Sequence, residues 1–197
     1  MVWKMSTVLS QICLAPSANP SMRCITLMNE VLSNVHSVQI GTDWIEKKEE
    51  LIAKLIRRHE TGSIIYKTQK SEVIQFKNRQ VNDRILQEVR NYFGKSVRLA
   101  GGTSFGWAYV TKMTESKKYH NHGNNFSFLS TVFYLVKPEG QSGKIGFIIN
   151  GKEETYNPRE GELLMFPCNL DHSPLEYKGD TYRIALNTQV YTKNRIL

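Results

Sequence analysis

The half of the chain after Gly101-Gly102 restricts the fold more than any other feature. In it, β-branched and aromatic residues gather into short runs, and breaks rich in Gly, Pro, Asn or charge separate the runs. The runs read FGWAYVTKM, FSFLSTVFYLV, KIGFIIN, ELLMFP and YRIALNTQVY, and the breaks include KPEGQSG, NGKEET and NPREG. This pattern is typical of strands joined by turns. We therefore expect a β-sandwich or jelly roll.

Two amphipathic helices are predicted ahead of this β-rich half. The first begins at Asp43 and Glu46, which have capping-box spacing, and its apolar residues follow a helical period. The second ends at Gly94, a natural left-handed cap, and one face of it carries Val81, Ile85, Leu86, Val89, Tyr92 and Phe93. Residues 1 to about 40 are expected to be irregular. The chain is thus expected to be α+β, mainly β, with helices that support the roll.

The length of 197 residues and the 40% of apolar residues suit one compact domain. Within it, we expect residues 1–99 to form an N-terminal extension with the supporting helices, and residues 100–197 to form the β core. No stretch approaches the roughly 20 apolar residues of a membrane span, and the first residues lack the core of a secretion signal. Cys13, Cys24 and Cys168 form no C-x-x-C pair. A reducing, cytoplasmic location is therefore expected.

The formal net charge of +8 would suit an acidic partner, including nucleic acid. The charge is scattered, however, and the segment KKEELIAKLIRRHE mixes both signs, as solvated helix faces usually do. Nucleic acid is therefore not the favoured partner.

Three histidines of the β-rich half are candidate metal ligands. His120 and His122 lie in HNHGN at the entrance of a predicted strand, and His172 follows a later strand in FPCNLDHSP. Residues i and i+2 of a strand point to the same face, so the first two can both point inward. Three such ligands make a facial set for iron that leaves positions open for substrate and oxygen. The spacing alone is weak, because a histidine beside Asn and Gly is more often an ordinary loop residue.

Arg183 adds a second signal. It begins the apolar strand YRIALN, where an unpaired cation would be costly. An anionic group is therefore expected to meet it.

These segments together resemble a known family. HNHGNNFSFLSTVFYLVKPEGQSGKIGF, PREGELLMFPCNLDHSP and YRIALN are similar, in order and spacing, to the core of the iron(II)- and 2-oxoglutarate-dependent oxygenases. The resemblance is to the prolyl-hydroxylase-like and related phage or bacterial members, and it covers roughly residues 100 to 190. It implies a double-stranded β-helix of the jelly-roll or cupin type. It also implies Fe(II), 2-oxoglutarate and O2, and hydroxylation of an unidentified substrate with release of succinate and CO2.

The resemblance assigns Fe(II) binding to His120, His122 and His172. Most family members have H-x-D, whereas here the third position is His122, or Asn124 if the motif begins at His122. We prefer His120 as the first ligand, because Asn is a poor replacement for a carboxylate and three imidazoles bind iron in related cupins. Without the carboxylate the site is one unit more positive, which changes iron affinity or redox behaviour.

The resemblance assigns cosubstrate binding to the last strand and its neighbour. Arg183 would form the salt bridge with the distal carboxylate of 2-oxoglutarate, since a guanidinium recognises a carboxylate through two hydrogen bonds. Tyr134 matches a family tyrosine that holds the same carboxylate, and a core tyrosine is an equal alternative. Asn187 faces the same way as Arg183 and would line the pocket. Ala185 replaces a frequent family serine.

Other functions remain open at this point. One is a cupin-type dioxygenase that uses three histidines without 2-oxoglutarate, and another is a non-catalytic basic binding module. The substrate, a small molecule or a peptide side chain, is not identified. Lys112, Lys117 and Lys118 could attract an anionic substrate to the metal, although solvated loop lysines are commoner.

Overall fold

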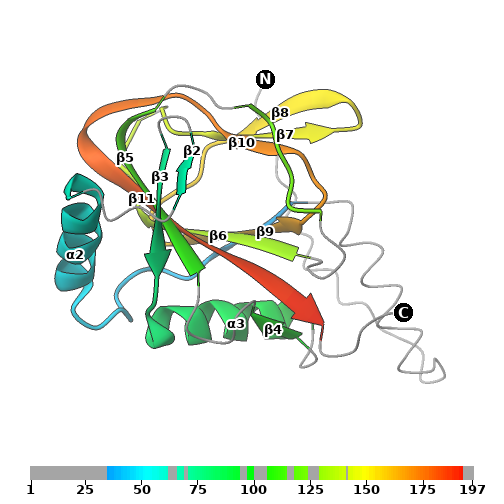
Figure 1. Ribbon diagram of the computed structural model, residues 1–197. Coiled ribbons are helices and arrows are strands. Elements are labelled where there is room, and N and C mark those ends of the chain that lie inside the picture. Colours follow the sequence, from blue (N-terminus) through cyan, green and yellow to red (C-terminus); the bar gives the residue numbers. More distant parts are fainter. Residues whose placement is uncertain are drawn as a thin grey trace.

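The computed structural model places two sheets face to face and two helices outside the larger one (Figure 1). The expected α+β class with a β roll is confirmed. The structure describes residues 35–61, 66–68, 71–93, 97–99, 106–114, 118–123, 129–140 and 142–192.

The larger sheet has the strand order β1-β9-β6-β11-β5-β3-β2, and β4 also pairs with β11. Its strands are β1 (His36–Gln39), β2 (Tyr66–Thr68), β3 (Ser71–Phe76), β4 (Val97–Leu99), β5 (Gly106–Thr114), β6 (Leu129–Val136), β9 (Glu162–Pro167) and β11 (Tyr177–Thr192). The smaller sheet has the order β10-β7-β8. Its strands are β7 (Ile145–Ile149), β8 (Lys152–Tyr156) and β10 (His172–Pro174).

The alternation of side chains along β11 separates the two faces of the larger sheet. Ile184 and Leu186 belong to the core under the helices, whereas Ala185 belongs to a second cluster between the sheets. Arg183 and Asn187 therefore lie on the same inner face as Ala185, because residues two apart on a strand share a face. The inner cluster takes residues from both sheets: Tyr109, Val132, Tyr134, Ile145, Phe147, Leu164, Phe166 and Ala185.

Helices α2 (Lys48–Glu60) and α3 (Arg79–Phe93) pack on the outer face of the larger sheet (Figure 1). The core-facing residues of α3 are fully or almost fully buried: Val81, Ile85, Leu86 and Val89. Each such apolar side chain stabilises the fold by roughly 1.5–3 kcal/mol relative to its exposed form. The predicted end of this helix before Gly94 is confirmed, but Tyr92 is 44% exposed and lies outside the core.

The predicted start of the first helix is wrong. Asp43 and Glu46 lie in turns, and α2 begins only at Lys48, because Lys47 adopts a left-handed backbone conformation with φ 53°. The Lys48 ammonium then bonds to Thr42 Oγ1 at 2.9 Å and to a carboxylate from the loop before β9. The apolar period that suggested an earlier start includes Trp44, whose indole N–H bonds to backbone carbonyls of the preceding turn.

Strands also occur where none was predicted. β1 lies within the expected irregular segment, β3 adds to the larger sheet between the helices, and β8 replaces a predicted break at NGKEET. The larger sheet therefore takes strands from both sides of residue 99, and the expected division there stays a prediction. Neither described helix has both the length and the apolar character needed to cross a membrane. Cys168 is a buried free thiol, and Cys13 and Cys24 lie outside the described residues.

Candidate active site

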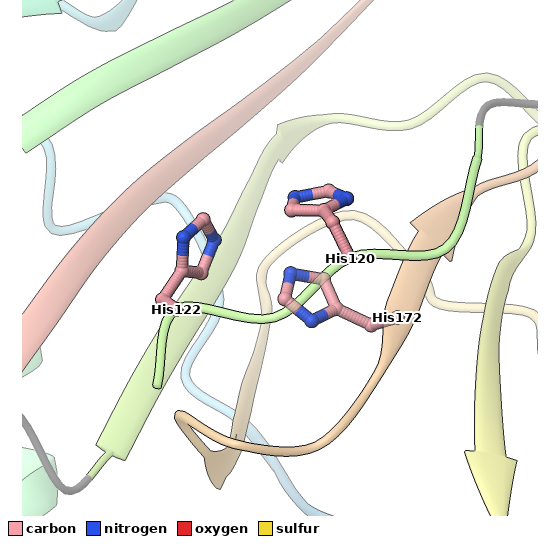
Figure 2. A group of neighbouring side chains, drawn as sticks. All are labelled: His120, His122 and His172. Atoms are coloured by element: carbon pink, nitrogen blue, oxygen red, sulfur yellow. The ribbon is translucent and has the colours of Figure 1, made fainter. Parts of the chain in front are cut away.

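Three imidazoles meet beside the smaller sheet (Figure 2). His120 and His122 come from one loop and His172 begins β10, and their possible ligand nitrogens all lie within 4.8 Å of one another. The ring centroids of His120 and His172 are 4.6 Å apart, and each is 5.1 Å from that of His122. A metal with bonds of about 2.1 Å needs its ligand nitrogens roughly 3 Å apart. Binding would therefore shorten the distances between the imidazole nitrogens by up to about 2 Å. The three candidate ligands of the preferred alignment, in which the motif begins at His120, therefore lie close together. Asn124, the candidate ligand of the alternative alignment, lies outside the described residues.

Backbone hydrogen bonds bring these histidines together. His120 and His172 form a two-residue bridge, with N···O distances of 3.1 and 2.9 Å, and the His122 N–H donates to the Cys168 carbonyl at 2.7 Å. Neither His120 nor His122 lies within a named strand, and residues 124–128, which connect them to β6, lie outside the described residues, so their placement at a strand entrance stays a prediction. The loop reaches the site because it is tied to the segment between β9 and β10.

A backbone carbonyl orients the His172 ring. The His172 Nδ1 lies 2.9 Å from the Leu170 carbonyl oxygen, which can only accept, so Nδ1 carries the proton. The Nε2 atom then keeps its lone pair for a metal.

The local environment keeps two of the imidazoles neutral. Burial lowers the pKa of His122 to about 4, and the nearby His120 adds to this effect. Burial likewise lowers the pKa of His172 to about 4, with repulsion from both other histidines as a smaller cause. The neutral imidazole is the form that binds metal.

Aromatic side chains surround the imidazoles. The Phe166 ring lies 4.7 Å from that of His172, and the Trp107 ring, from β5, lies 5.9 Å from that of His122. Phe147 packs on Phe166 at 5.1 Å. Trp107 had no signal in the sequence beyond its position in a predicted strand.

Arg183 lies on the inner face of β11, opposite Thr111 of β5, and is 2% exposed. Its guanidinium carbon lies 5.5 Å from the ring centroids of both Tyr109 and Tyr177. Its buried Nε has no hydrogen-bond partner, and no carboxylate in the described part of the chain pairs with it. A buried cation without an acidic partner is costly, so this geometry suits an anionic ligand.

Tyr134 and Asn187 occupy different parts of the inner face. Tyr134 pairs across the sheet with Ala185 and is almost fully buried, and burial raises the pKa of its hydroxyl while the nearby Arg183 opposes that shift. Its hydroxyl therefore stays protonated as a donor near the guanidinium. Asn187 lies opposite Trp107, and its amide donates to the Ala185 carbonyl at 3.2 Å. Four residues of extended chain, about 13 Å, separate Asn187 from Arg183, so Asn187 lies toward the imidazoles.

The lysines do not form a common group at the metal site. Lys112 stacks on Tyr182 at 4.7 Å, on the outer face of the larger sheet. Lys118 is exposed, and its carbonyl faces the His120 ring at 3.4 Å. Lys117 lies outside the described residues.

Comparison with known proteins places the fold. No family model and no curated protein matches the chain. A prolyl-4-hydroxylase from Pseudomonas putida has a TM-score of 0.59 at 9% identity, covering 87% of this chain and 100% of that one. The epimerase SnoN of nogalamycin biosynthesis, described as non-heme and α-ketoglutarate-dependent, has a TM-score of 0.63 at 10% identity, covering 87% and 82%. HygX from Streptomyces hygroscopicus, solved with nickel and 2-oxoglutarate, has a TM-score of 0.57 at 10% identity, covering 89% and 88%. The chain therefore has the double-stranded β-helix fold of the iron(II)- and 2-oxoglutarate-dependent oxygenases.

Proposed function

We propose that the protein is an iron(II)- and 2-oxoglutarate-dependent dioxygenase that hydroxylates an as yet unidentified substrate, with release of succinate and CO2. The observation that carries the proposal is the buried guanidinium of Arg183, without an acidic partner among the described residues, inside a roll that also holds three clustered imidazoles. HygX, which has the same fold, binds nickel together with 2-oxoglutarate.

The imidazoles of His120, His122 and His172 would hold the iron. Neutral nitrogen donors suit Fe(II), and the Leu170 carbonyl already orients the His172 ring for binding. When bound with 2-oxoglutarate and oxygen, the metal supplies the oxidising chemistry.

The inner face would bind and orient the cosubstrate. Arg183 would pair with its distal carboxylate, while the rings of Tyr109 and Tyr177 restrict the guanidinium between them. The protonated Tyr134 hydroxyl would be a further donor to the same carboxylate. The apolar cluster between the sheets excludes water from the reacting groups.

Turnover of 2-oxoglutarate tests this function without a known substrate. We expect slow succinate formation that requires both Fe(II) and 2-oxoglutarate, measured by mass spectrometry under air. Arg183→Gln should lower it at least 10-fold through loss of a charge-assisted pair, whereas Arg57→Gln, on the exposed face of α2, should not change it. Succinate formation that is independent of added iron would contradict the proposal.

A second candidate is a cupin-type dioxygenase that works without a cosubstrate. The observation that favours it is the candidate metal site itself, which consists of three histidines and contains no carboxylate. Oxygen consumption that needs iron but not 2-oxoglutarate would select it. Arg183 would then bind an anionic group of the substrate itself.

A further inference from the structure

The strand pairing beside Arg183 brings a second cation to the inner face. Tyr134 of β6 pairs with Ala185, but Val136 pairs with Ile184, so the register shifts by one residue between them. This bulge leaves Leu135 without a partner on β11. Continuing the register by one residue places Lys137, which directly follows β6, opposite Arg183. Residues opposite each other across an antiparallel pair share a face.

The turn that follows β6 contacts the side chains of both Lys137 and Arg183. The ammonium of Lys137 donates to the Pro138 carbonyl at 3.1 Å and to the Ser142 carbonyl at 3.0 Å. The next residue, Gly143, lies against the guanidinium: a Cβ there would be 3.1 Å from Nη1 of Arg183. An ammonium has three N–H donors, so one donor of Lys137 remains for a ligand.

The two carboxylates near these cations are bonded to groups other than the Lys137 ammonium and the Arg183 guanidinium. Glu162, buried on the inner face, accepts a hydrogen bond from the Tyr156 hydroxyl and another from the Arg159 N–H at 2.8 Å. Glu160 forms its ion pair with Lys48 at 2.8 Å, and its other carboxylate oxygen accepts a hydrogen bond from the Lys137 backbone N–H at 3.4 Å.

The Lys137 side chain is therefore held in a place that is unfavourable for a charge. Lys137 is 7% exposed, and burial lowers the pKa of its ammonium, with the nearby Arg183 as the second cause. Two like charges that face each other across a sheet destabilise it unless an anion lies between them.

We infer that Lys137 is a second cation of the Arg183 site and that the two side chains together bind the distal carboxylate of a dicarboxylate ligand. The identity of that ligand as 2-oxoglutarate rests on the proposed function. Lys137 would thereby raise the affinity of the site for the dicarboxylate.

Binding measurements separate this role from the metal site. Ni(II)-loaded protein is titrated with 2-oxoglutarate by calorimetry, and metal-free protein is titrated with glutarate, which lacks the chelating keto group, by ligand-observed NMR. In Lys137→Met, loss of one charge-assisted contact should weaken the binding of both ligands by roughly 10- to 100-fold. Lys137→Arg should recover most of this affinity, and Lys144→Met, which removes the same charge from a neighbouring position, should bind like the wild type.

Salt dependence distinguishes a ligand contact from a purely structural role in holding the turn. Added salt weakens binding that depends on charge. If Lys137 contacts the ligand, the affinity of Lys137→Met should fall less steeply with added salt than that of the wild type. If Lys137 only holds the turn, Lys137→Met should bind more weakly but with the wild-type salt dependence. Wild-type affinity and salt dependence in Lys137→Met would overturn the inference and leave the proposed function standing. Glutarate binding that depends on Lys137, without tighter binding of 2-oxoglutarate to the Ni(II) form, would support the inference and contradict the proposed function. Absence of any dicarboxylate binding to the wild type would overturn both.

Discussion

Asn121 and Asp171 form a hydrogen bond between the two segments that carry the candidate metal ligands. The Asn121 Nδ2 donates to Asp171 Oδ1 at 2.7 Å across 50 residues of sequence. Asn121 stands between His120 and His122, and Asp171 directly precedes His172. The pair therefore ties together the two segments that carry the three imidazoles, and it places a carboxylate in the chain position next to His172.

Removing this hydrogen bond should weaken metal binding. We expect Asn121→Ala to lower the affinity for Ni(II) about 10- to 100-fold, because partners that orient ligands typically contribute that much. Calorimetric titration of metal-free protein measures it. Asn157→Ala, at an exposed position outside the site, provides the control. Equal affinity in the two variants would show that the imidazoles are ordered without the pair.

A carboxylate at position 122 should be accepted as a ligand. We expect His122→Asp to retain Ni(II) binding, because aspartate also binds such metals and would remove one unit of positive charge. His122→Ala should lose at least 10-fold in affinity, since only two imidazoles remain. The Co(II) absorption spectrum should change in His122→Asp, which reports a changed ligand set. An unchanged spectrum would mean that His122 does not bind the metal.

The stability of the metal-free protein should fall in mild acid. The pKa of His122 and that of His172 are about 4 in the folded protein and near 6.5 in the unfolded chain. Between these values the unfolded chain binds more protons, so the free energy of unfolding decreases as pH falls from about 6.5 to about 4. Urea unfolding at several pH values measures this slope. His172→Asn should make the slope shallower, and an unchanged slope would contradict the assignment.

The turn over Arg183 should require glycine for two separate reasons. Gly143 and Gly151 have nearly equal positive φ angles of 75° and 74°, but a Cβ meets Arg183 only at Gly143, while Gly151 faces open space. Both alanine variants should lose about 1–2 kcal/mol through backbone strain. Gly143→Ala alone should also weaken 2-oxoglutarate binding, because it displaces the guanidinium. Equal ligand affinity in the two variants would mean that this contact does not position Arg183.

Much of the fold follows from local pattern. β9 and the body of β5, β6, β7 and β11 carry runs of branched and aromatic residues, and the sequence predicts them for that reason. β8 was missed because its residues are charged or polar and mostly exposed, so no apolar alternation marks it. The start of α2 was misplaced because Lys47 breaks the helix through its backbone conformation, which composition does not reveal.

The sequence by itself determined the roll, its supporting helices, the three histidines as candidate ligands and Arg183 as a cation that needs an anion. These features depend on residue type and on local spacing, and both can be read from the sequence without knowledge of the tertiary contacts. Only the tertiary structure decided that His120 pairs with His172, and that a bulge at Leu135 shifts the pairing of β6 with β11 directly beside Arg183. Such contacts depend on the register between distant strands, and that register is set by closure of the whole roll.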